Sequence, residues 1–279
     1  MKVINDALIS DITSYKLSGK ISKLVFPSSV SELKDVLKST DKYKIVGFGS
    51  NLIISESYDG VIIKLSELNE ISFNKNIVCV GCGYSLSKLS MECAKKGLSG
   101  LEFACGIPGS IGGAVYMNAG AYGMSISDVL SKVWVLDGTE IKELGINDLN
   151  FDYRNSVFKG KNYVILKAEF VLNYKDSDLI LDDVKQIMNS RREKQPLEFP
   201  SAGSVFRNPE GYSAGRLIEK AGIKGMRVGD AEVSLKHANF IVNRGNASAE
   251  DVIQLISKVK KIVKDKFDVV LEEEQEIVR

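Results

Sequence analysis

The residues of this 279-residue chain best suited to chemistry lie in or beside three clusters of glycine. The clusters are Gly47-Phe48-Gly49-Ser50-Asn51, Gly81-Cys82-Gly83, and 106–113, the last continuing through 118–123. Glycine among apolar residues indicates backbone held close to other backbone or to a ligand. Free N–H groups in such turns bind anions, and phosphate is the usual one. The first two clusters fit tight turns as well as a ligand, whereas the third favours a ligand because it has six glycines in eighteen positions.

These glycines do not follow the common nucleotide-binding patterns. Leu52 and Leu86 stand where a G-x-G-x-x-G motif would place its third glycine, and no G-x-x-x-x-G-K-[ST] motif occurs. A nucleotide cofactor would therefore bind outside the Rossmann and P-loop patterns.

Three polar segments could supply reactive groups: 151–156, which contains Arg154, 201–209, which contains Ser204, and 271–274. Each alone also fits an ordinary surface turn, a loop or a charged chain end. On a strand, Glu272 and Glu274 would share one face, which is costly to bury unless cations or hydrogen bonds meet them.

Two other chemistries are disfavoured. Cys79 and Cys82 have C-x-x-C spacing, but no second close pair completes a structural zinc site, so we expect no metal and interpret the thiols as small buried side chains. His237 is the single histidine and no G-x-S-x-G motif accompanies it. We interpret it as a structural hydrogen-bonding group or a neighbour of the substrate.

The charge balance excludes some partners. Lys and Arg number 37 against 36 Asp and Glu, so no overall field favours nucleic acid or an acidic membrane. No apolar run approaches the roughly 18 residues of a membrane span. Four cysteines in a chain of this size make a disulfide scaffold unexpected. We expect a cytoplasmic protein with roughly two domains by length.

Periodicity and capping residues predict helices and short strands in alternation, which indicates an α+β fold. Expected helices are 31–38, 85–96, 179–194, 214–221 and a long helix capped by Ser248, and expected strands are 44–48, 60–65, 76–80, 132–136, 163–172, 237–242 and 269–278. The sequence pattern changes after the strand expected at 163–172, to a long helix followed by Pro196 and Pro200, and this change predicts a domain boundary near residue 180.

Taken together, the segments resemble the UDP-N-acetylenolpyruvoylglucosamine reductase family, in its shorter type II branch. The resemblance runs from about Thr13 to Glu274 and rests on seven motifs in the family's order: Gly47-Phe48-Gly49-Ser50-Asn51-Leu52, 106–114, 118–123, Tyr153-Arg154-Asn155-Ser156, 202–209, Lys236-His237-Ala238-Asn239-Phe240 and Leu271-Glu272-Glu273-Glu274. Two segments depart from the family: Thr13-Ser14-Tyr15-Lys16-Leu17-Ser18-Gly19-Lys20 replaces its usual Thr-Phe-Arg-Ile-Gly-Gly, and Gln275-Glu276 replaces its usual Val-Arg or Val-Lys.

The resemblance implies an FAD-binding region of the vanillyl-alcohol-oxidase (PCMH) type in residues 1–180, with subdomains of about 1–66 and 67–180. A smaller substrate-binding domain would follow in residues 181–279. The residues implied to hold FAD through backbone N–H groups are Gly47, Gly49, Ser50, Asn51, Leu52, Ile107, Pro108, Gly109, Ser110, Gly112, Gly113 and Ala114.

The family's chemistry implies three catalytic roles. NADPH reduces the flavin, which then delivers hydride to C3 of an enolpyruvyl group on a UDP-sugar. Arg154 would bind the carboxylate and stabilise the anion, Glu274 would assist polarisation as an acid, and Ser204 would protonate C2. The residues implied to bind the UDP-sugar are Lys194, Asn208 and Arg207.

We expect a monomer that binds NADPH and a UDP-sugar. Two alternatives stay open: another FAD-dependent oxidase or reductase of the same fold, and a non-catalytic nucleotide-sugar binding protein.

Overall fold

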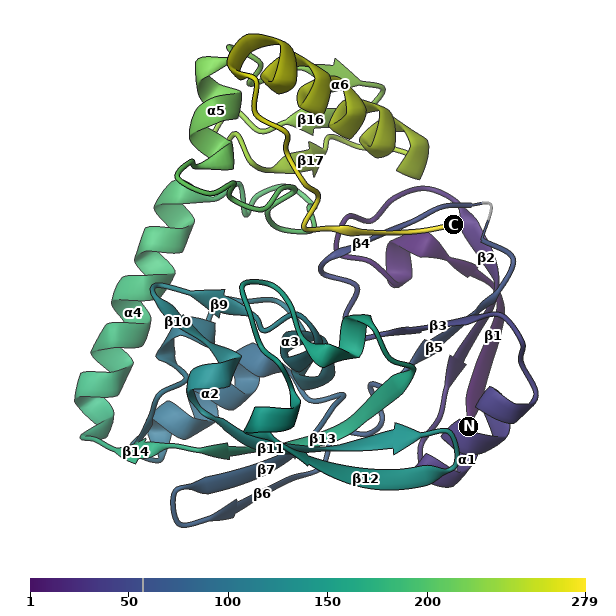
Figure 1. Cartoon of the computed structure of the whole chain (residues 1–279), viewed down its shortest axis with the longest axis vertical. Coiled ribbons are helices and arrows are strands. Elements are labelled where there is room, and N and C mark those ends of the chain that lie inside the picture. The colour runs from purple at the N-terminus through teal and green to yellow at the C-terminus, as the bar shows by residue number, and fades with distance from the viewer. Residues whose placement is uncertain (57) are drawn as a thin grey trace. The chain divides into compact units, whose positions relative to one another are not determined.

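The computed structural model describes residues 1–56 and 58–279 (Figure 1). The α-helices are α1 (Val30–Lys38), α2 (Leu86–Lys95), α3 (Ile111–Tyr116), α4 (Ser177–Lys194), α5 (Ala214–Lys220) and α6 (Ala249–Phe267). The strands are β1 (Lys2–Leu8), β2 (Lys20–Phe26), β3 (Tyr43–Val46), β4 (Leu52–Ile54), β5 (Val61–Lys64), β6 (Ile71–Asn74), β7 (Ile77–Gly81), β8 (Leu98–Ser99), β9 (Gly120–Ala121), β10 (Met124–Ser125), β11 (Leu130–Asp137), β12 (Glu140–Gly145), β13 (Tyr163–Val171), β14 (Asn173–Tyr174), β15 (Arg227–Val228), β16 (Ala231–Val233), β17 (Ile241–Asn243) and β18 (Glu276–Val278). Short 3-10 turns cover Ile9–Asp11, Glu102–Ala104, Ile126–Asp128, Ile146–Asp148 and Val157–Lys159.

The described chain forms two compact units, each made of several segments. Unit 1 comprises Met1–Val3, Val25–Phe48 and Ile62–Arg191, and unit 2 comprises Ile4–Leu24, Gly49–Val61 and Arg192–Arg279. The predicted functional boundary at residue 180 stays a prediction, because these units are defined by contacts and not by ligands.

Unit 1 is built on a five-stranded antiparallel sheet with strand order β12-β11-β13-β7-β6 (Figure 1). Its central strand β13 is rich in β-branched and aromatic residues, which suit a pleated, half-buried surface. Val133 pairs with Ala168, and Phe170 pairs with Val78, all four of them buried. Helix α3 packs against β13 and β7, so the sheet supports the glycine-rich segment that precedes this helix.

The helices of unit 1 begin and end at capping residues. The Ser85 hydroxyl accepts a hydrogen bond from the Lys88 N–H at 3.3 Å at the start of α2, and Gly97 follows its end with a φ of +69°. Helix α4 packs on this region through a small apolar cluster that contains Ala94, Ile180 and Val184.

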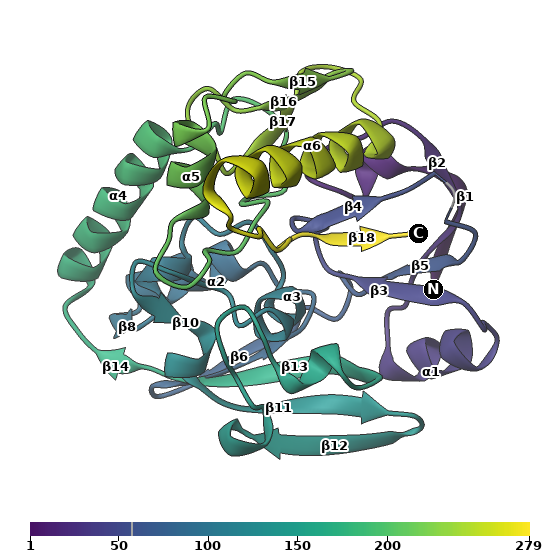
Figure 2. The same cartoon turned by 45° about the horizontal axis from the view of Figure 1, so that its top comes forward.

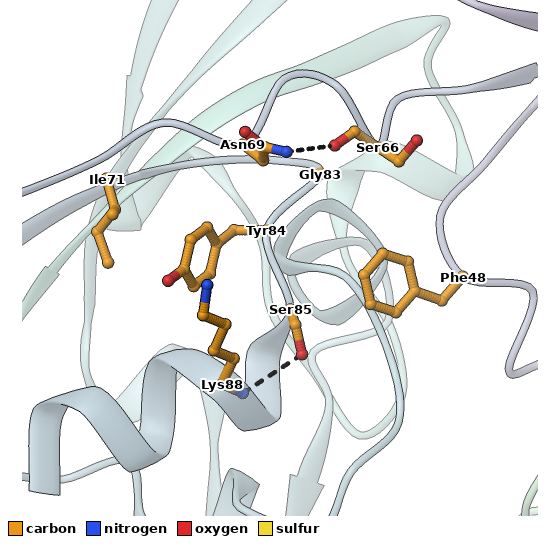
Figure 3. Close-up of a pocket in the computed structure, with 8 residues that line it drawn as sticks. All are labelled: Phe48, Ser66, Asn69, Ile71, Gly83, Tyr84, Ser85 and Lys88. Atoms are coloured by element: carbon orange, nitrogen blue, oxygen red, sulfur yellow. Dashed lines mark hydrogen bonds between the residues drawn. The ribbon is translucent and has the colours of Figure 1, made fainter.

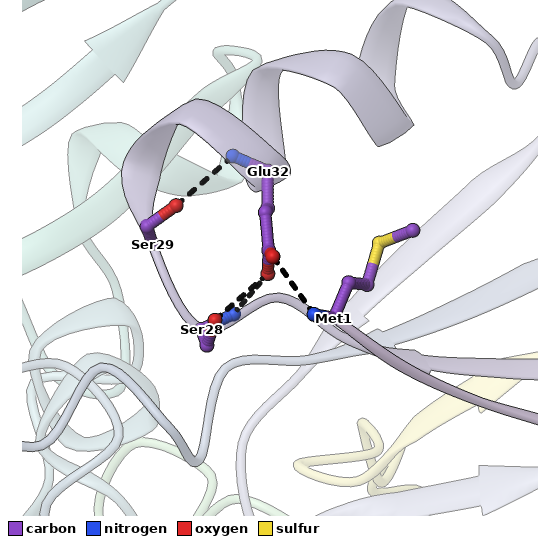
Figure 4. A network of polar contacts seen from close by, with 4 residues as sticks. All are labelled: Met1, Ser28, Ser29 and Glu32. Carbon is purple, nitrogen blue, oxygen red and sulfur yellow. Dashed lines mark hydrogen bonds and ion pairs between the residues drawn. The ribbon is translucent and has the colours of Figure 1, made fainter.

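The first turn of α1 carries a network of polar contacts (Figure 4). Ser29 caps the helix, its hydroxyl accepting from the Glu32 N–H at 3.2 Å. The Glu32 carboxylate accepts from the Met1 amino group at 2.8 Å, and from the Ser28 N–H and hydroxyl at 2.8 and 2.9 Å. These donors lower the pKa of Glu32 to about 2, chiefly through the hydrogen bond with the amino group.

Unit 2 contains a three-stranded antiparallel sheet, β15-β16-β17, with α6 packed on it (Figure 2). Helix α6 begins at a capping box in which Ser248 and Asp251 exchange side-chain and backbone hydrogen bonds. Its buried face is a single apolar stripe, consisting of Val252, Leu255, Ile256, Val259 and Val263. Strand β18 pairs in parallel with β4, with Glu276 opposite Leu52.

The α+β prediction is confirmed, as are the predicted helices to within two residues at their starts. Two predicted strands are wrong in extent. Of 237–242, only Ile241 onward is strand, because the preceding residues form a turn closed by the hydrogen bond from the Phe240 N–H to the His237 carbonyl at 2.9 Å. Of 269–278, only Glu276–Val278 is strand, because regular pairing with β4 begins there. Within 1–56 and 58–279 no helix is both long enough and apolar enough to cross a membrane.

Candidate active site

The loop before α3 uses most of its own N–H groups. Ile107 donates to Ala104, Ile111 to Tyr84 and Gly112 to Cys82 at 2.8–3.0 Å, and Gly113 donates to the Ser110 hydroxyl at 3.3 Å. Within the described chain, the N–H groups of Gly109 and Ser110 have no hydrogen-bond partner. These two adjacent N–H groups, just before α3, are therefore the donors in this loop that could bind an anion as predicted.

Gly47 lies directly against this loop. A Cβ atom at Gly47 would come within 2.3 Å of the Ser110 hydroxyl oxygen, so a side chain there would displace the cap of α3. Gly81 and Gly83 serve a different purpose, because a Cβ atom at either position would come within 2.3 Å of a main-chain carbonyl, of Leu68 or Leu65. The second glycine cluster is thus explained by close backbone packing.

A pocket of about 440 Å³ opens on unit 1 beside this loop (Figure 3). It is lined by Phe48, Ser66, Asn69, Ile71, Gly83, Tyr84, Ser85 and Lys88. Ser85 forms an isolated antiparallel bridge with Ser110, which connects the pocket to the two free N–H groups. The Lys88 ammonium lies 4.9 Å from the centre of the Tyr84 ring. Aromatic walls, hydroxyls and one cation suit a planar polar group. This pocket was not predicted from the sequence, although Gly83 belongs to the second glycine cluster.

Arg154 lies in a tight turn of unit 1, and its side chain contacts segment 118–123, another of the predicted motifs. Its φ of +52° is left-handed, and an isolated bridge between Asp152 and Asn155 closes the turn. Its guanidinium donates to the Gly120 carbonyl at 2.7 Å. The Asn118 amide donates to the Asp152 carbonyl at 3.2 Å. These two hydrogen bonds hold segment 118–123 against the turn that contains Arg154, and they fix the position of the guanidinium.

In unit 2 the segment containing Ser204 lies between two other predicted motifs. Ser204 forms an antiparallel bridge with Phe240 on one side, and Phe206 forms one with Glu273 on the other. The Glu274 N–H donates to the Val205 carbonyl at 2.8 Å, and the Arg207 N–H donates to the Glu272 carbonyl at 2.9 Å. Ser204 and Glu274 are thus held on neighbouring chain segments although 70 positions separate them in sequence.

The three glutamates of 272–274 have different environments. The Glu273 carboxylate forms an ion pair with Lys260 of α6, at 2.8 and 2.9 Å, and Glu272 is exposed. Neither Glu272 nor Glu274 lies in a strand, so the expectation that they share a strand face is wrong. Glu274 is half-buried, and its carbonyl accepts from the Asn51 amide at 3.0 Å. Asn51, predicted to contact cofactor, therefore also holds the Glu274 segment.

The remaining residues of the first glycine cluster also lie in unit 2. Gly49 has a φ of +67°, and its carbonyl accepts from the Ser14 N–H at 3.1 Å. A Cβ atom at Gly49 would come within 2.2 Å of the Ile12 carbonyl oxygen, so backbone packing accounts for this glycine. Ser50 precedes Asn51, and Leu52 begins β4.

The predicted substrate-binding residues occupy unit 2 and differ in exposure. Lys194 is exposed at the end of α4. The Asn208 side-chain oxygen accepts from the Ala214 N–H at 3.0 Å. The Arg207 Nε atom is buried and has no hydrogen-bond partner among the residues described. A buried donor of this kind is costly unless a ligand satisfies it.

The cysteines and His237 are not arranged as reactive groups. Burial raises the pKa of all four thiols, that of Cys82 to about 12, so none is a thiolate at neutral pH. His237 lies edge-on to Phe240 and its Nδ1 accepts from the Asn239 N–H at 3.3 Å, while burial lowers its pKa. In residues 1–56 and 58–279 no three His, Cys, Asp or Glu side chains are grouped to hold a metal ion.

Comparison with known proteins gives matches to both parts of the chain. Residues 21–142 match the FAD binding domain family, and residues 195–278 match the family described as UDP-N-acetylenolpyruvoylglucosamine reductase, C-terminal domain. The UDP-N-acetylenolpyruvoylglucosamine reductase of Bacillus subtilis (strain 168) is 44% identical over 286 residues, which cover 99% of this chain and 94% of that protein. The protein of the same name from Clostridium novyi (strain NT) is 44% identical over 283 residues, covering 99% of this chain and 92% of that protein.

A solved structure gives the same result. The crystal structure of UDP-N-acetylenolpyruvylglucosamine reductase (MurB) from Thermus caldophilus superposes with a TM-score of 0.87 and 35% identity, covering 100% of both chains. The matched FAD binding domain and the superposed structure define an FAD-dependent oxidoreductase. Within that class, the chain belongs to the UDP-N-acetylenolpyruvoylglucosamine reductase family.

Proposed function

We propose that this chain reduces UDP-N-acetylglucosamine enolpyruvate to UDP-N-acetylmuramate with electrons from NADPH, as a monomeric cytoplasmic enzyme of peptidoglycan precursor synthesis. The observation that carries the proposal is the pairing of the Ser204 and Glu274 segments, through the 2.8 Å hydrogen bond from the Glu274 N–H to the Val205 carbonyl. The pairing brings a hydroxyl and a carboxyl, the two groups implied to act as acids, into one part of unit 2.

FAD fits the residues of unit 1. The free N–H groups of Gly109 and Ser110 suit a phosphate oxygen, and Gly47 leaves room for the loop because it has no side chain. The pocket beside Tyr84 and Lys88 suits the adenosine end of the cofactor. When bound, the flavin supplies hydride transfer, from NADPH to C3 of the enolpyruvyl group.

The protein's own groups complete the reduction of the double bond. Hydride adds to C3, charge develops at C2 and on its carboxylate, and the Ser204 hydroxyl donates the proton that C2 needs. Serine is a weak acid, so it can act only beside a strongly basic carbon and must then be reprotonated. Arg154 offers a planar fork that matches the carboxylate, and its contact with the Gly120 carbonyl fixes its direction. Glu274 assists the polarisation of the enolpyruvyl group.

Binding of the UDP portion is assigned to Lys194, Arg207 and Asn208. The strongest support for this assignment is the Arg207 Nε atom, which is buried and has no hydrogen-bond partner among the described residues. An anionic oxygen of the UDP portion would accept its hydrogen bond. The Asn208 amide nitrogen stays available while its oxygen binds the Ala214 N–H.

The test is anaerobic spectroscopy of the purified flavin-loaded protein. We expect NADPH to bleach the flavin absorbance and the enolpyruvyl substrate to restore it. A protein that stays colourless when FAD is added contradicts the proposal. Rapid recovery of colour with oxygen alone, before any substrate is added, would instead identify an oxidase.

A further inference from the structure

Asn239 belongs to the 236–240 motif, which the proposed chemistry does not use. Its side chain is 5% exposed and pairs with both main-chain polar groups of Phe206. The amide nitrogen donates to the Phe206 carbonyl at 2.8 Å, and the amide oxygen accepts from the Phe206 N–H at 3.0 Å. The Asn239 carbonyl accepts from the Val205 N–H at 2.9 Å. Three hydrogen bonds thus fix the two residues that follow Ser204.

Gln275 makes similar contacts on the other side of Ser204. Its side chain is 4% exposed, and its amide nitrogen donates to the carbonyls of Ala202 and Gly203 at 3.1 and 3.2 Å. Its amide oxygen accepts from the Tyr15 hydroxyl at 3.0 Å. Because both main-chain carbonyls can only accept, the amide nitrogen must face them, and the glutamine amide has one orientation.

The two amides hold a turn that needs support. Gly203 has a φ of +75°, and a Cβ atom built there would meet no other atom within 4 Å, so crowding at this position does not account for its left-handed conformation. We propose that Asn239 and Gln275 are positioning residues that fix the main chain on both sides of Ser204, and so aim its hydroxyl for proton transfer. This inference rests on the proposed function. Proton transfer needs hydrogen-bond geometry, and misplacement by about 1 Å can cost on the order of a hundredfold in rate.

Asn239→Leu is the principal test because it keeps the volume and removes the amide. The control is Asn76→Leu, since the Asn76 amide also donates to a main-chain carbonyl, that of Leu172 at 2.7 Å, and both residues belong to unit 1. In stopped-flow measurements on flavin-loaded protein, we expect Asn239→Leu to slow reoxidation by the enolpyruvyl substrate at least tenfold. Reduction by NADPH should change less than twofold, and Asn76→Leu should leave both rates within twofold of wild type.

Gln275→Met supplies a second, independent variant, with Gln254→Met as its control on the exposed face of α6. We expect a fivefold or greater slowing of reoxidation with Gln275→Met alone. In a Ser204→Ala background, neither Asn239→Leu nor Gln275→Met should slow reoxidation further, because both act through that hydroxyl.

Other outcomes separate the two hypotheses. Equal slowing of both half-reactions, or the same slowing in the Ser204→Ala background, overturns the positioning role alone. A wild-type protein whose reduced flavin is not reoxidised by the substrate overturns the proposed function, and the positioning role with it. If Asn239→Leu does not fold, Gln275→Met and its control decide the question.

Discussion

The side-chain amide of Asn51 donates to the main-chain carbonyl of Glu274 at 3.0 Å, and the Glu276 N–H returns a hydrogen bond to the Asn51 carbonyl at 3.0 Å. Asn51, a residue of the first glycine cluster, therefore holds the main chain at Glu274, the candidate acid, which lies near the C-terminus. Parallel pairing of β4 with β18 continues directly from this contact. The first hydrogen bond explains why a residue with a side-chain N–H donor stands beside the glycines.

Glu274 should be the reactive carboxyl of the three. Glu274→Gln should lower turnover by about a hundredfold or more, in the range that acid–base groups contribute. Glu273→Gln is the matched control: its ion pair with Lys260 is partly exposed, so its loss should cost less than about 1 kcal/mol of stability and leave turnover within twofold. Steady-state NADPH oxidation measures both variants. A larger loss of turnover in Glu273→Gln than in Glu274→Gln would show that Glu273 is the reactive carboxyl and would contradict the assignment.

Arg154→Lys should weaken recognition of the substrate carboxylate. Lysine keeps the charge but lacks the planar fork, and it cannot reproduce the guanidinium contact with Gly120. We expect kcat/KM for the enolpyruvyl substrate to fall at least tenfold while flavin reduction by NADPH persists. Lys161→Met, which removes an exposed cation near Tyr163, serves as the control. Unchanged kcat/KM in Arg154→Lys would remove this residue from the site.

Gly47→Ala should impair FAD binding. Its new Cβ atom would lie 2.3 Å from the Ser110 hydroxyl oxygen, and the cap of α3 would have to move. We expect weaker FAD binding, measured by quenching of FAD fluorescence, and a lower Tm. Gly160→Ala is the control because Gly160 lies outside the predicted FAD-binding residues and its Cβ would come no closer than 4.0 Å to another atom, the Val157 carbonyl oxygen. Equal FAD affinity in Gly47→Ala and wild type would contradict the assignment.

Acid should destabilise the turn that contains His237. Burial lowers the pKa of His237 in the folded protein, so the unfolded chain binds its proton first as the pH falls. The contribution of His237 to stability is therefore complete above its ordinary pKa of about 6.5 and decreases below it. His237→Asn keeps an acceptor for the Asn239 N–H but does not titrate. Urea unfolding at pH 7.5 and 5.5 should show a smaller pH difference in this variant, and an equal difference would contradict the assignment.

Locally encoded features were predictable from sequence. Ser248, Asp251 and the apolar stripe of α6 all lie within one helix, so capping and periodicity define it without knowledge of the rest of the chain. The same holds for α2, with Ser85 at one end and Gly97 at the other.

Features that depend on distant partners were not predictable. The Asn239 side chain replaces regular strand pairing by binding the main chain of Phe206, so hydrophobicity alone placed the strand start too early. Which glutamate faces a cation depends on Lys260, which α6 brings to Glu273. The pocket beside Tyr84 is assembled from separate loops, strand β6 and helix α2, and no single motif describes it.

The most direct test of the central claim is the behaviour of Ser204→Ala in the two half-reactions, followed anaerobically in a stopped-flow instrument. We predict that NADPH bleaches the bound flavin at close to the wild-type rate, whereas the enolpyruvyl substrate restores the absorbance at least a hundredfold more slowly than in wild type. Reoxidation of the Ser204→Ala flavin by substrate at the wild-type rate would contradict the assignment of Ser204 as the proton donor.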